Sequence, residues 1–164
     1  MGLRTFLAID LPSSLHSTIG QKQEILKREL AGISWVKSEN LHITLKFLGD
    51  TPETKIDELQ QVVTQAVKGI PSFVITLRGF GAFPDKRAPR TLWTGIEGDT
   101  EILVSLANQI ESAVAPLGFP PESKPFRPHL TLARIKRNHH AIGQHTRLGR
   151  CRDRWTGCRR GSRS

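Results

Sequence analysis

The sequence predicts an α+β fold of two pseudo-symmetric lobes, each an antiparallel sheet with helices on its outer face, with a groove between the lobes. The 164 residues carry the order strand, helix, strand twice. Two of the expected strands nearly repeat each other, with LHITL at 41–45 and PHLTL at 128–132. Matching elements are 86 residues apart at the first strand and 87 apart at the repeated strand. A repeated order at a nearly fixed spacing indicates a duplicated structural unit.

The first half of the chain predicts strands at 4–11, 41–48 and 72–80, where β-branched and aromatic residues are frequent. Between the first two strands, apolar residues recur at intervals of one or two helical turns, which predicts a helix. We expect this helix to open at Ser13 and to end at Gly32, because glycine commonly follows the last helical turn.

A second helix is expected to start at Thr51. Its hydroxyl is a capping group, Pro52 suits the first helical position, and the carboxylate of Glu53 suits the positive end of a helix. The apolar face of this helix consists of Ile56, Leu59, Val62, Val63, Ala66 and Val67.

The second half begins the same order again, with a strand at 90–97 and a helix that Asp99 caps. A proline-rich loop leads to a strand at 129–135. The duplicated plan then calls for a further helix and strand, but 138–164 shows no periodicity. We therefore expect a folded body over 1–137, with an incomplete second lobe, and a basic, poorly ordered tail over 138–164.

The net charge of +9 is concentrated in that tail, which holds seven arginines and one acidic residue. The rest of the chain has 17 basic and 14 acidic residues and is only mildly basic. No apolar run reaches the ~20 residues of a membrane span, and the stretch 1–11 is too short and too acidic for a secretory signal. These features predict a cytoplasmic protein that does not enter a membrane.

Both cysteines, Cys151 and Cys158, lie in the tail near three histidines. Their spacing matches no standard zinc pattern, so we expect no metal site and no cofactor.

The repeated strands carry the residues with chemical potential. Because side chains alternate along a strand, His42, Thr44 and Lys46 are expected on one face, with Lys46 exposed to solvent. His129 and Thr131 are placed in the same way on the second strand. Two histidines facing each other across a groove suit attack on a phosphodiester, because imidazole exists in both protonation states near neutral pH. The threonine hydroxyls suit hydrogen bonds to the phosphate oxygens.

These segments resemble the two-histidine phosphoesterase superfamily, and within it the RNA 2′,3′-cyclic phosphodiesterases also known as 2′-5′ RNA ligases. The matching stretches span 4 to about 137. They are RTFLAIDLP at 4–12, LHITLKFLG at 41–49, FP at 83–84, PRTLW at 89–93 and FRPHLTLAR at 126–134.

The resemblance implies hydrolysis of 2′,3′-cyclic phosphates at RNA ends to 2′-phosphomonoesters without a metal. It implies that His42 donates a proton to the leaving 3′ oxygen and that His129 accepts one from the attacking water. It also implies that Phe6 either stacks on the terminal base or belongs to the core. Arg134 would bind phosphate or base, but strict alternation points it away from His129 unless the strand bulges.

Three alternatives stay open. The same histidine pair would serve 2′-5′ RNA ligation, or the hydrolysis of small cyclic nucleotides rather than RNA. The atypical C-terminus is also compatible with an RNA-binding module that has lost catalysis. The expected partner is RNA or an oligonucleotide end that bears a 2′,3′-cyclic phosphate, and the protein is expected to be a monomer.

Overall fold

The computed structural model describes residues 2–30, 32–85, 87–135 and 154–155. Its helices and strands are β1 (Gly2–Asp10), α1 (Ser13–Glu29), β2 (Ile33–Trp35), β3 (His42–Pro52), α2 (Ile56–Ala66), β4 (Ile75–Phe83), β5 (Thr91–Gly98), α3 (Thr100–Val114), β6 (His129–Ile135) and β7 (Arg154–Trp155). Single turns of 3₁₀ helix lie at Ser38–Asn40, Glu53–Lys55 and Ala115–Leu117.

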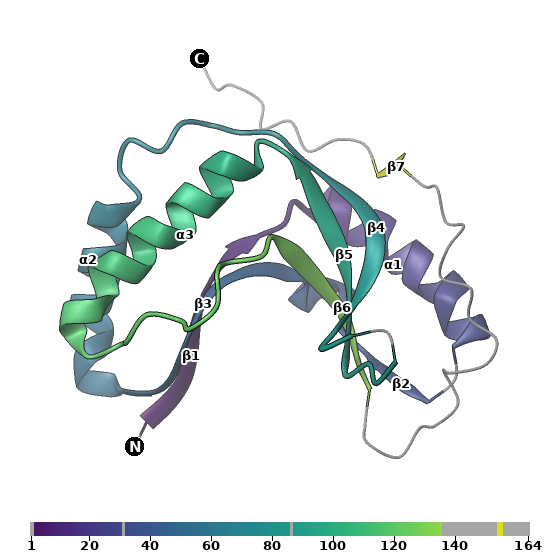
Figure 1. Ribbon diagram of the computed structural model, residues 1–164, viewed down its shortest axis with the longest axis horizontal. Coiled ribbons are helices and arrows are strands. Elements are labelled where there is room, and N and C mark those ends of the chain that lie inside the picture. Colours follow the sequence, from purple (N-terminus) through teal and green to yellow (C-terminus); the bar gives the residue numbers. More distant parts are fainter. Residues whose placement is uncertain (1, 31, 86, 136–153, 156–164) are drawn as a thin grey trace.

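The described strands form two antiparallel sheets, as expected for the α+β class. One sheet pairs β1 with β3, and the other has the order β2, β6, β5, β4, β7. Each histidine strand therefore belongs to a different sheet. Figure 1 shows β3 and β6 next to each other in the middle of the molecule.

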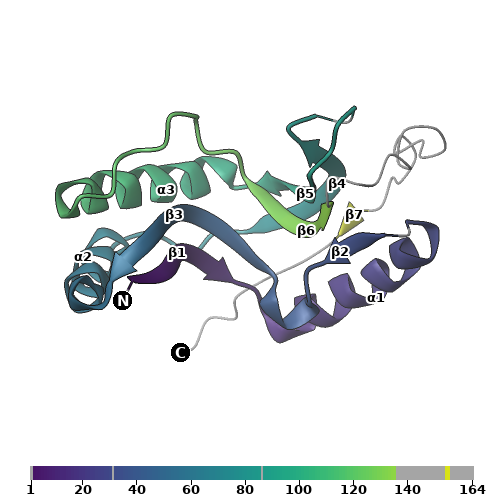
Figure 2. The ribbon, with the colours of Figure 1, turned by 90° about the horizontal axis from the view of Figure 1, so that it is seen from below.

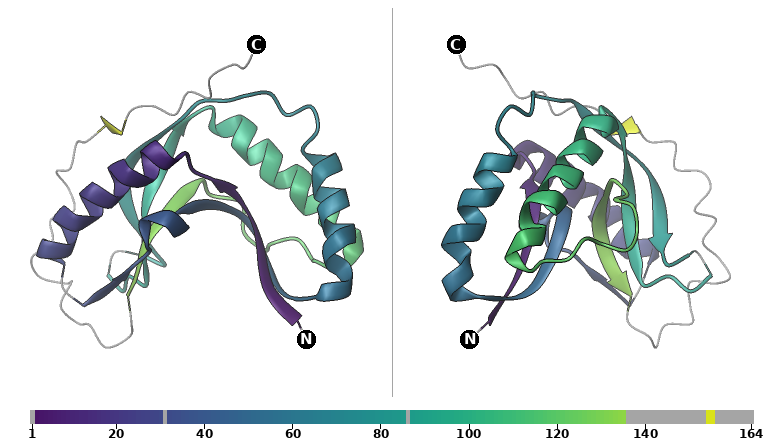
Figure 3. Two further views of the ribbon diagram at one scale, coloured as in Figure 1. Left: turned by 180° about the vertical axis from the view of Figure 1, so that it is seen from behind. Right: turned by 60° about the vertical axis from the view of Figure 1, so that its left-hand side comes forward.

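The helices lie at the two ends of the molecule, with α2 and α3 near β1 and β3, and α1 near β2 and β6 (Figures 2 and 3). The side-chain amide of Gln23 on α1 donates to Val36 O at 3.0 Å and to Leu132 O at 3.1 Å. The helix that follows β1 in the chain thus packs on the sheet that contains β6. The two lobes are consequently interleaved in sequence rather than being its two halves.

A single hydrophobic core backs both histidine strands. It contains Ile43 and Leu45 from β3, Leu130 and Leu132 from β6, and Ile19 from α1. The buried stripe of α3 completes it with Leu103, Leu106, Ala107, Ile110 and Val114. Because burial of such side chains is the main favourable contribution to folding, the shared core fixes β3 and β6 relative to each other.

Both histidine strands contain a β-bulge at the same place. Along β3, Thr44 lies opposite Ala8 but Lys46 lies opposite Leu7, which leaves Leu45 without a partner residue. Along β6, Thr131 lies opposite Trp93 but Ala133 lies opposite Leu92, which leaves Leu132 in the same situation. An extra residue of this kind reverses the alternation of side chains beyond it.

The expected start of the second helix at Thr51 is wrong. Thr51 lies in β3, is fully buried and contacts the hydroxyl of Thr5. The reason is that β3 pairs with β1 as far as Pro52, so the sheet takes up this segment. The helix itself begins at Ile56.

Two further details differ from the expectations. Strand β2 was not predicted, since three residues are too few to show a period of two. The equivalent residues of β1 and β5 are 85 apart, as with Asp10 opposite His42 and Gly95 opposite His129, rather than 86. The Arg-Thr pairs that suggested 86 are therefore out of register by one residue.

The prediction of a poorly ordered tail over 138–164 falls outside the described residues, apart from β7. Arg154 and Trp155 of β7 pair with Arg78 and Leu77 of β4. Among the described residues, no helix is long and apolar enough to cross a membrane.

Candidate active site

Each histidine stands at the first position of its strand and is held in the same way. The Nδ1 of His42 donates to the carbonyl oxygen of Asn40 at 2.8 Å. The Nδ1 of His129 donates to the carbonyl oxygen of Arg127 at 2.6 Å. In both cases the acceptor belongs to the residue two positions earlier in the chain. A carbonyl accepts but cannot donate, so both Nδ1 atoms carry hydrogen.

This arrangement leaves the Nε2 atoms of His42 and His129 available. Within the described part of the chain, neither Nε2 has a hydrogen-bond partner. Each ring is half-buried, which keeps it accessible to a substrate while its orientation is fixed. A hydrogen bond at one ring nitrogen that sets the state of the other is the usual way to prepare a histidine for proton transfer.

Thr44 and Thr131 follow the histidines by two positions, and both are half-buried. The intervening residues, Ile43 and Leu130, are fully buried. The predicted alternation is therefore present between histidine and threonine on both strands. Because the buried faces of neighbouring strands β3 and β6 enter one core, the histidines and threonines lie on the opposite, outward side of each strand.

His42 has an aromatic neighbour. The ring of Phe6 stacks on it with centroids 4.7 Å apart and planes inclined by 21°. Phe47 lies next to Phe6, with ring centroids 6.3 Å apart. Phe6 is 46% exposed and Phe47 is 59% exposed. Phe6 is thus a surface residue at the candidate site and not an ordinary core phenylalanine.

His129 has a different aromatic environment. Phe83 meets it edge to face with centroids 5.0 Å apart, and Trp93 lies 6.1 Å away at an angle of 66°. Phe83 and Trp93 also contact each other. Sequence reasoning assigned neither residue a role, although both occur in the stretches FP and PRTLW that carried the family resemblance.

Arg134 lies beyond the bulge at Leu132, opposite Thr91 of β5. Leu132 and Ala133 are both buried and Arg134 is exposed. Alternation resumes one residue late, so Arg134 comes to the outward side that carries His129 and Thr131. The condition for its predicted role, a bulge before it, is met.

The expected position of Lys46 is wrong. The bulge at Leu45 turns Lys46 to the inner side, where it is 2% exposed, and brings Phe47 outward in its place. Lys46 ends in a hydrogen-bonded ion pair with Glu111, whose nitrogen–oxygen distance is 2.9 Å.

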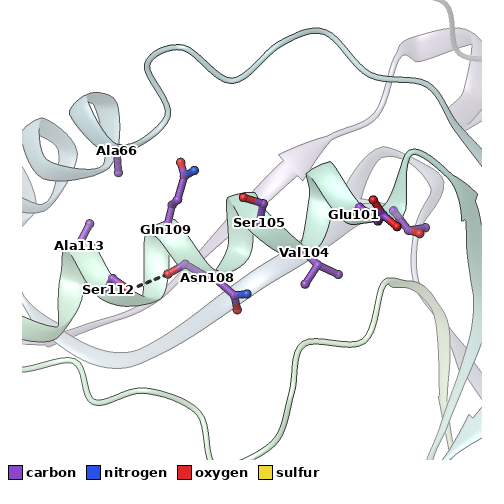
Figure 4. A pocket seen from close by; sticks show the side chains of 9 residues that line it. Ala66, Glu101, Val104, Ser105, Asn108, Gln109, Ser112 and Ala113 are labelled. Carbon is purple, nitrogen blue, oxygen red and sulfur yellow. Dashed lines mark hydrogen bonds between the residues drawn. The ribbon is translucent and has the colours of Figure 1, made fainter.

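One further surface feature of the described residues lies away from the histidines. A depression of about 870 Å³ lies over the outer stripe of α3 and the end of α2, as Figure 4 shows, and neither histidine lines it. Within the described ranges, no three His, Cys, Asp or Glu side chains gather as a metal-ligand set. The cysteines and histidines weighed for zinc, Cys151, Cys158, His139, His140 and His145, lie outside those ranges.

Comparison with known proteins places this chain in a family. The chain matches the family described as LigT like Phosphoesterase over residues 9–93 and 96–145. An RNA 2′,3′-cyclic phosphodiesterase from Thermotoga maritima is 39% identical over 134 residues, which are 82% of this chain and 71% of that protein.

Solved structures agree with this match. A structure from Thermus thermophilus gives a TM-score of 0.70 at 30% identity, covering 82% of this chain and 75% of that one. The structure of Escherichia coli LigT complexed with 3′-AMP gives a TM-score of 0.66 at 30% identity, and the match covers 82% of this chain and 74% of that one. Agreement of this extent defines the protein as a phosphoesterase. The chain belongs to the LigT-like phosphoesterase family, as its motifs indicated.

Proposed function

We propose that this protein hydrolyses 2′,3′-cyclic phosphates at the ends of RNA to 2′-phosphomonoesters, with His42 as the proton donor and His129 as the proton acceptor. The observation that carries the proposal is the matched anchoring of the two rings. Both Nδ1 atoms are held by carbonyl oxygens, at 2.8 Å in His42 and 2.6 Å in His129, so both Nε2 atoms are free to exchange a proton with substrate.

The reaction is a displacement at phosphorus. The Nε2 of His129 takes a proton from water as its oxygen bonds to phosphorus. The bond from phosphorus to the ribose 3′ oxygen breaks, and the protonated Nε2 of His42 gives that oxygen a proton. The hydroxyls of Thr44 and Thr131 donate to the non-bridging phosphate oxygens, where negative charge is held in the transition state.

The matched relatives support the choice of substrate. The Thermotoga maritima protein and one from Methanothermobacter thermautotrophicus, 38% identical over 83% of this chain and 73% of that protein, are both named RNA 2′,3′-cyclic phosphodiesterase. LigT of Escherichia coli forms complexes with 3′-AMP and with phosphate. Both of these ligands carry a phosphate group, and 3′-AMP is in addition a ribonucleotide, as is the terminal residue of the proposed substrate.

The side chains on the sides of His42 and His129 suit a nucleobase and a phosphate. The exposed rings of Phe6 and Phe47 give a nucleobase a surface to stack on. The guanidinium of Arg134, on the side of His129, is suited to a phosphate of the RNA chain.

The test is hydrolysis of a short RNA with a 2′,3′-cyclic phosphate end, in the presence of EDTA. We compare the unmodified chain with His42→Ala and His129→Ala. The matched control is His16→Gln, because the two ring nitrogens of His16 contact the carbonyl oxygens of Ser38 and Leu11, which marks it as a structural histidine. Each active-site variant should lower turnover by about 10²- to 10⁴-fold, while RNA binding changes little.

Phosphorus NMR identifies the product. A 2′-phosphate, formed by the unmodified chain and by His16→Gln only, is the expected result. A 3′-phosphate product would contradict the roles given to the two histidines. Salt-sensitive RNA binding without turnover, indifferent to His42→Ala, would instead favour an RNA-binding module.

A further inference from the structure

Lys46 of β3 and Glu111 of α3 form a buried ion pair. The side chain of Lys46 is only 1% exposed, and that of Glu111 is 16% exposed. The Nζ of Lys46 donates to Glu111 Oε1 and also to the carbonyl oxygen of Pro120, both at 2.9 Å. The other carboxylate oxygen of Glu111 accepts the backbone N–H of Glu122 at 3.0 Å. Two of the four groups in this network therefore belong to the main chain of the loop that precedes β6.

That loop leads directly to His129. Pro120 lies nine residues before His129, and the carbonyl of Arg127, near the end of the loop, holds the His129 ring. Between these points Phe126 packs against the core. The loop that begins at Pro120 thus leads, past Phe126, to the Arg127 carbonyl that holds the imidazole.

Lys46 itself lies four residues after His42 on β3. It is turned inward by the bulge at Leu45, the same feature that keeps Phe47 outward. One side chain therefore connects the strand that carries His42 with the loop that positions His129. The same segment has two other anchors, the buried ring of Phe119 and the hydrogen bond from Lys55 to Leu117 O.

We propose that Lys46, with Glu111, is a positioning residue for the reaction, which sets His129 relative to His42 by holding the main chain at Pro120 and Glu122. The proposal rests on the function proposed above. Each side chain holds a different main-chain group, because Lys46 donates to the carbonyl of Pro120 and Glu111 accepts from the N–H of Glu122. Removing one charge leaves the other buried and unpaired, which is strongly destabilising, whereas replacing both charges is often tolerated.

The experiment therefore uses two doubly substituted chains, Lys46→Met with Glu111→Gln, and Lys46→Leu with Glu111→Met. Neither leaves a buried charge. The control is Lys27→Met with Glu24→Gln, which removes an exposed ion pair of the same kind from α1. Urea unfolding midpoints and circular dichroism show which chains are folded, and kinetics are compared only among those.

We expect the folded double variants to lose about ten- to a hundred-fold in kcat with little change in KM, because small displacements of a reacting group are costly to the chemical step. The ring resonances of His129 in ¹H–¹³C spectra should move while those of His42 stay in place. The control pair should leave kcat and both histidine signals unchanged. A purely structural role would lower stability without separating kcat from KM or one histidine from the other.

Three results would overturn the inference: kcat at the level of the unmodified chain, a loss of activity that follows the unfolded fraction, or failure of both double variants to fold. The last would make the pair a requirement for folding rather than for positioning. If the unmodified chain has no turnover at all, the proposed function fails, and the His129 resonance still decides whether Lys46 positions that ring.

Discussion

Leu45 and Leu132 occupy the same place in the two histidine strands, each as the extra residue of a β-bulge that directly follows the histidine and threonine of its strand. Their side chains are both buried in the shared core. Beyond each bulge the next outward residue is Phe47 on β3 and Arg134 on β6. The duplicated backbone thus presents an aromatic ring on the outward side of one histidine strand and a guanidinium on the outward side of the other.

The first prediction concerns the exposed aromatic rings of Phe6 and Phe47. Phe6→Leu and Phe47→Leu should each lower kcat/KM for a nucleoside 2′,3′-cyclic phosphate, because stacking of a base on an aromatic ring contributes about 1–3 kcal/mol. The matched substrate is ribose 2′,3′-cyclic phosphate without a base, for which these variants should differ little from the unmodified chain. Val67→Ala, which alters an exposed apolar residue just after α2, is the control. Equal losses on both substrates would argue against stacking and for a role in holding the His42 ring.

The second prediction concerns the guanidinium of Arg134. Arg134→Ala should raise KM for RNA with a cyclic phosphate end, since a hydrogen bond to a charged group contributes about 1.5–3 kcal/mol. Arg134→Lys should restore only part of the affinity, because an ammonium cannot form the paired bonds of a guanidinium. The control is Arg78→Ala, which removes an exposed arginine paired with Glu97 on the same sheet. Steady-state kinetics at two salt concentrations check this, and similar behaviour of the two alanine variants would contradict it.

The histidines, the threonines and the two-sheet α+β class could be predicted because each rests on a short-range pattern that survives in the structure. Residues after the bulges could not be placed in this way. A bulge adds one residue without changing hydrophobicity, so alternation assigned Lys46 to the surface, whereas the structure buries Lys46 and exposes Phe47. For Arg134 the sequence left the side of the strand open, because its predicted role required a bulge before it. Thr51 was misplaced for another reason: its local sequence suits a helix start, and pairing with β1 overrides that preference.

The third prediction concerns Trp93, whose ring lies next to His129. Gly81 lies opposite Trp93, and a Cβ added there would come within 2.1 Å of the indole ring. Gly81→Ala should therefore displace Trp93 and lower the free energy of unfolding by about 1–3 kcal/mol, as overpacking usually does. Gly20→Ala is the comparison, because its new Cβ would meet only Ser38, with the Cβ atoms 3.4 Å apart. That substitution in the middle of α1 should stabilise by about 0.5–1 kcal/mol. Urea denaturation monitored by tryptophan fluorescence measures both, and a Gly81→Ala protein as stable as the unmodified chain would contradict the packing described.

The last prediction concerns the loop that follows Phe83. The carboxylate of Asp85 accepts the backbone N–H of Ala88 at 3.0 Å and of Arg87 at 2.7 Å. These two hydrogen bonds, Ala88 first, hold the pKa of the Asp85 carboxyl below its ordinary value. Because the pKa is depressed, the two hydrogen bonds stabilise the loop when the pH is above the ordinary pKa of aspartate. This contribution is lost as the pH falls through the lower pKa of the folded state.

The amide signals of Arg87 and Ala88 should therefore shift together between about pH 6 and pH 2, with a midpoint below the value of about 3.9 for an unstructured aspartate. Asp85→Asn is the matched control, because its side-chain oxygen still accepts both N–H groups but does not titrate. In that variant the two signals should stay constant over the same range in ¹H–¹⁵N spectra. A midpoint at or above the ordinary pKa of aspartate in the unmodified chain would mean that the carboxylate does not hold the loop in solution.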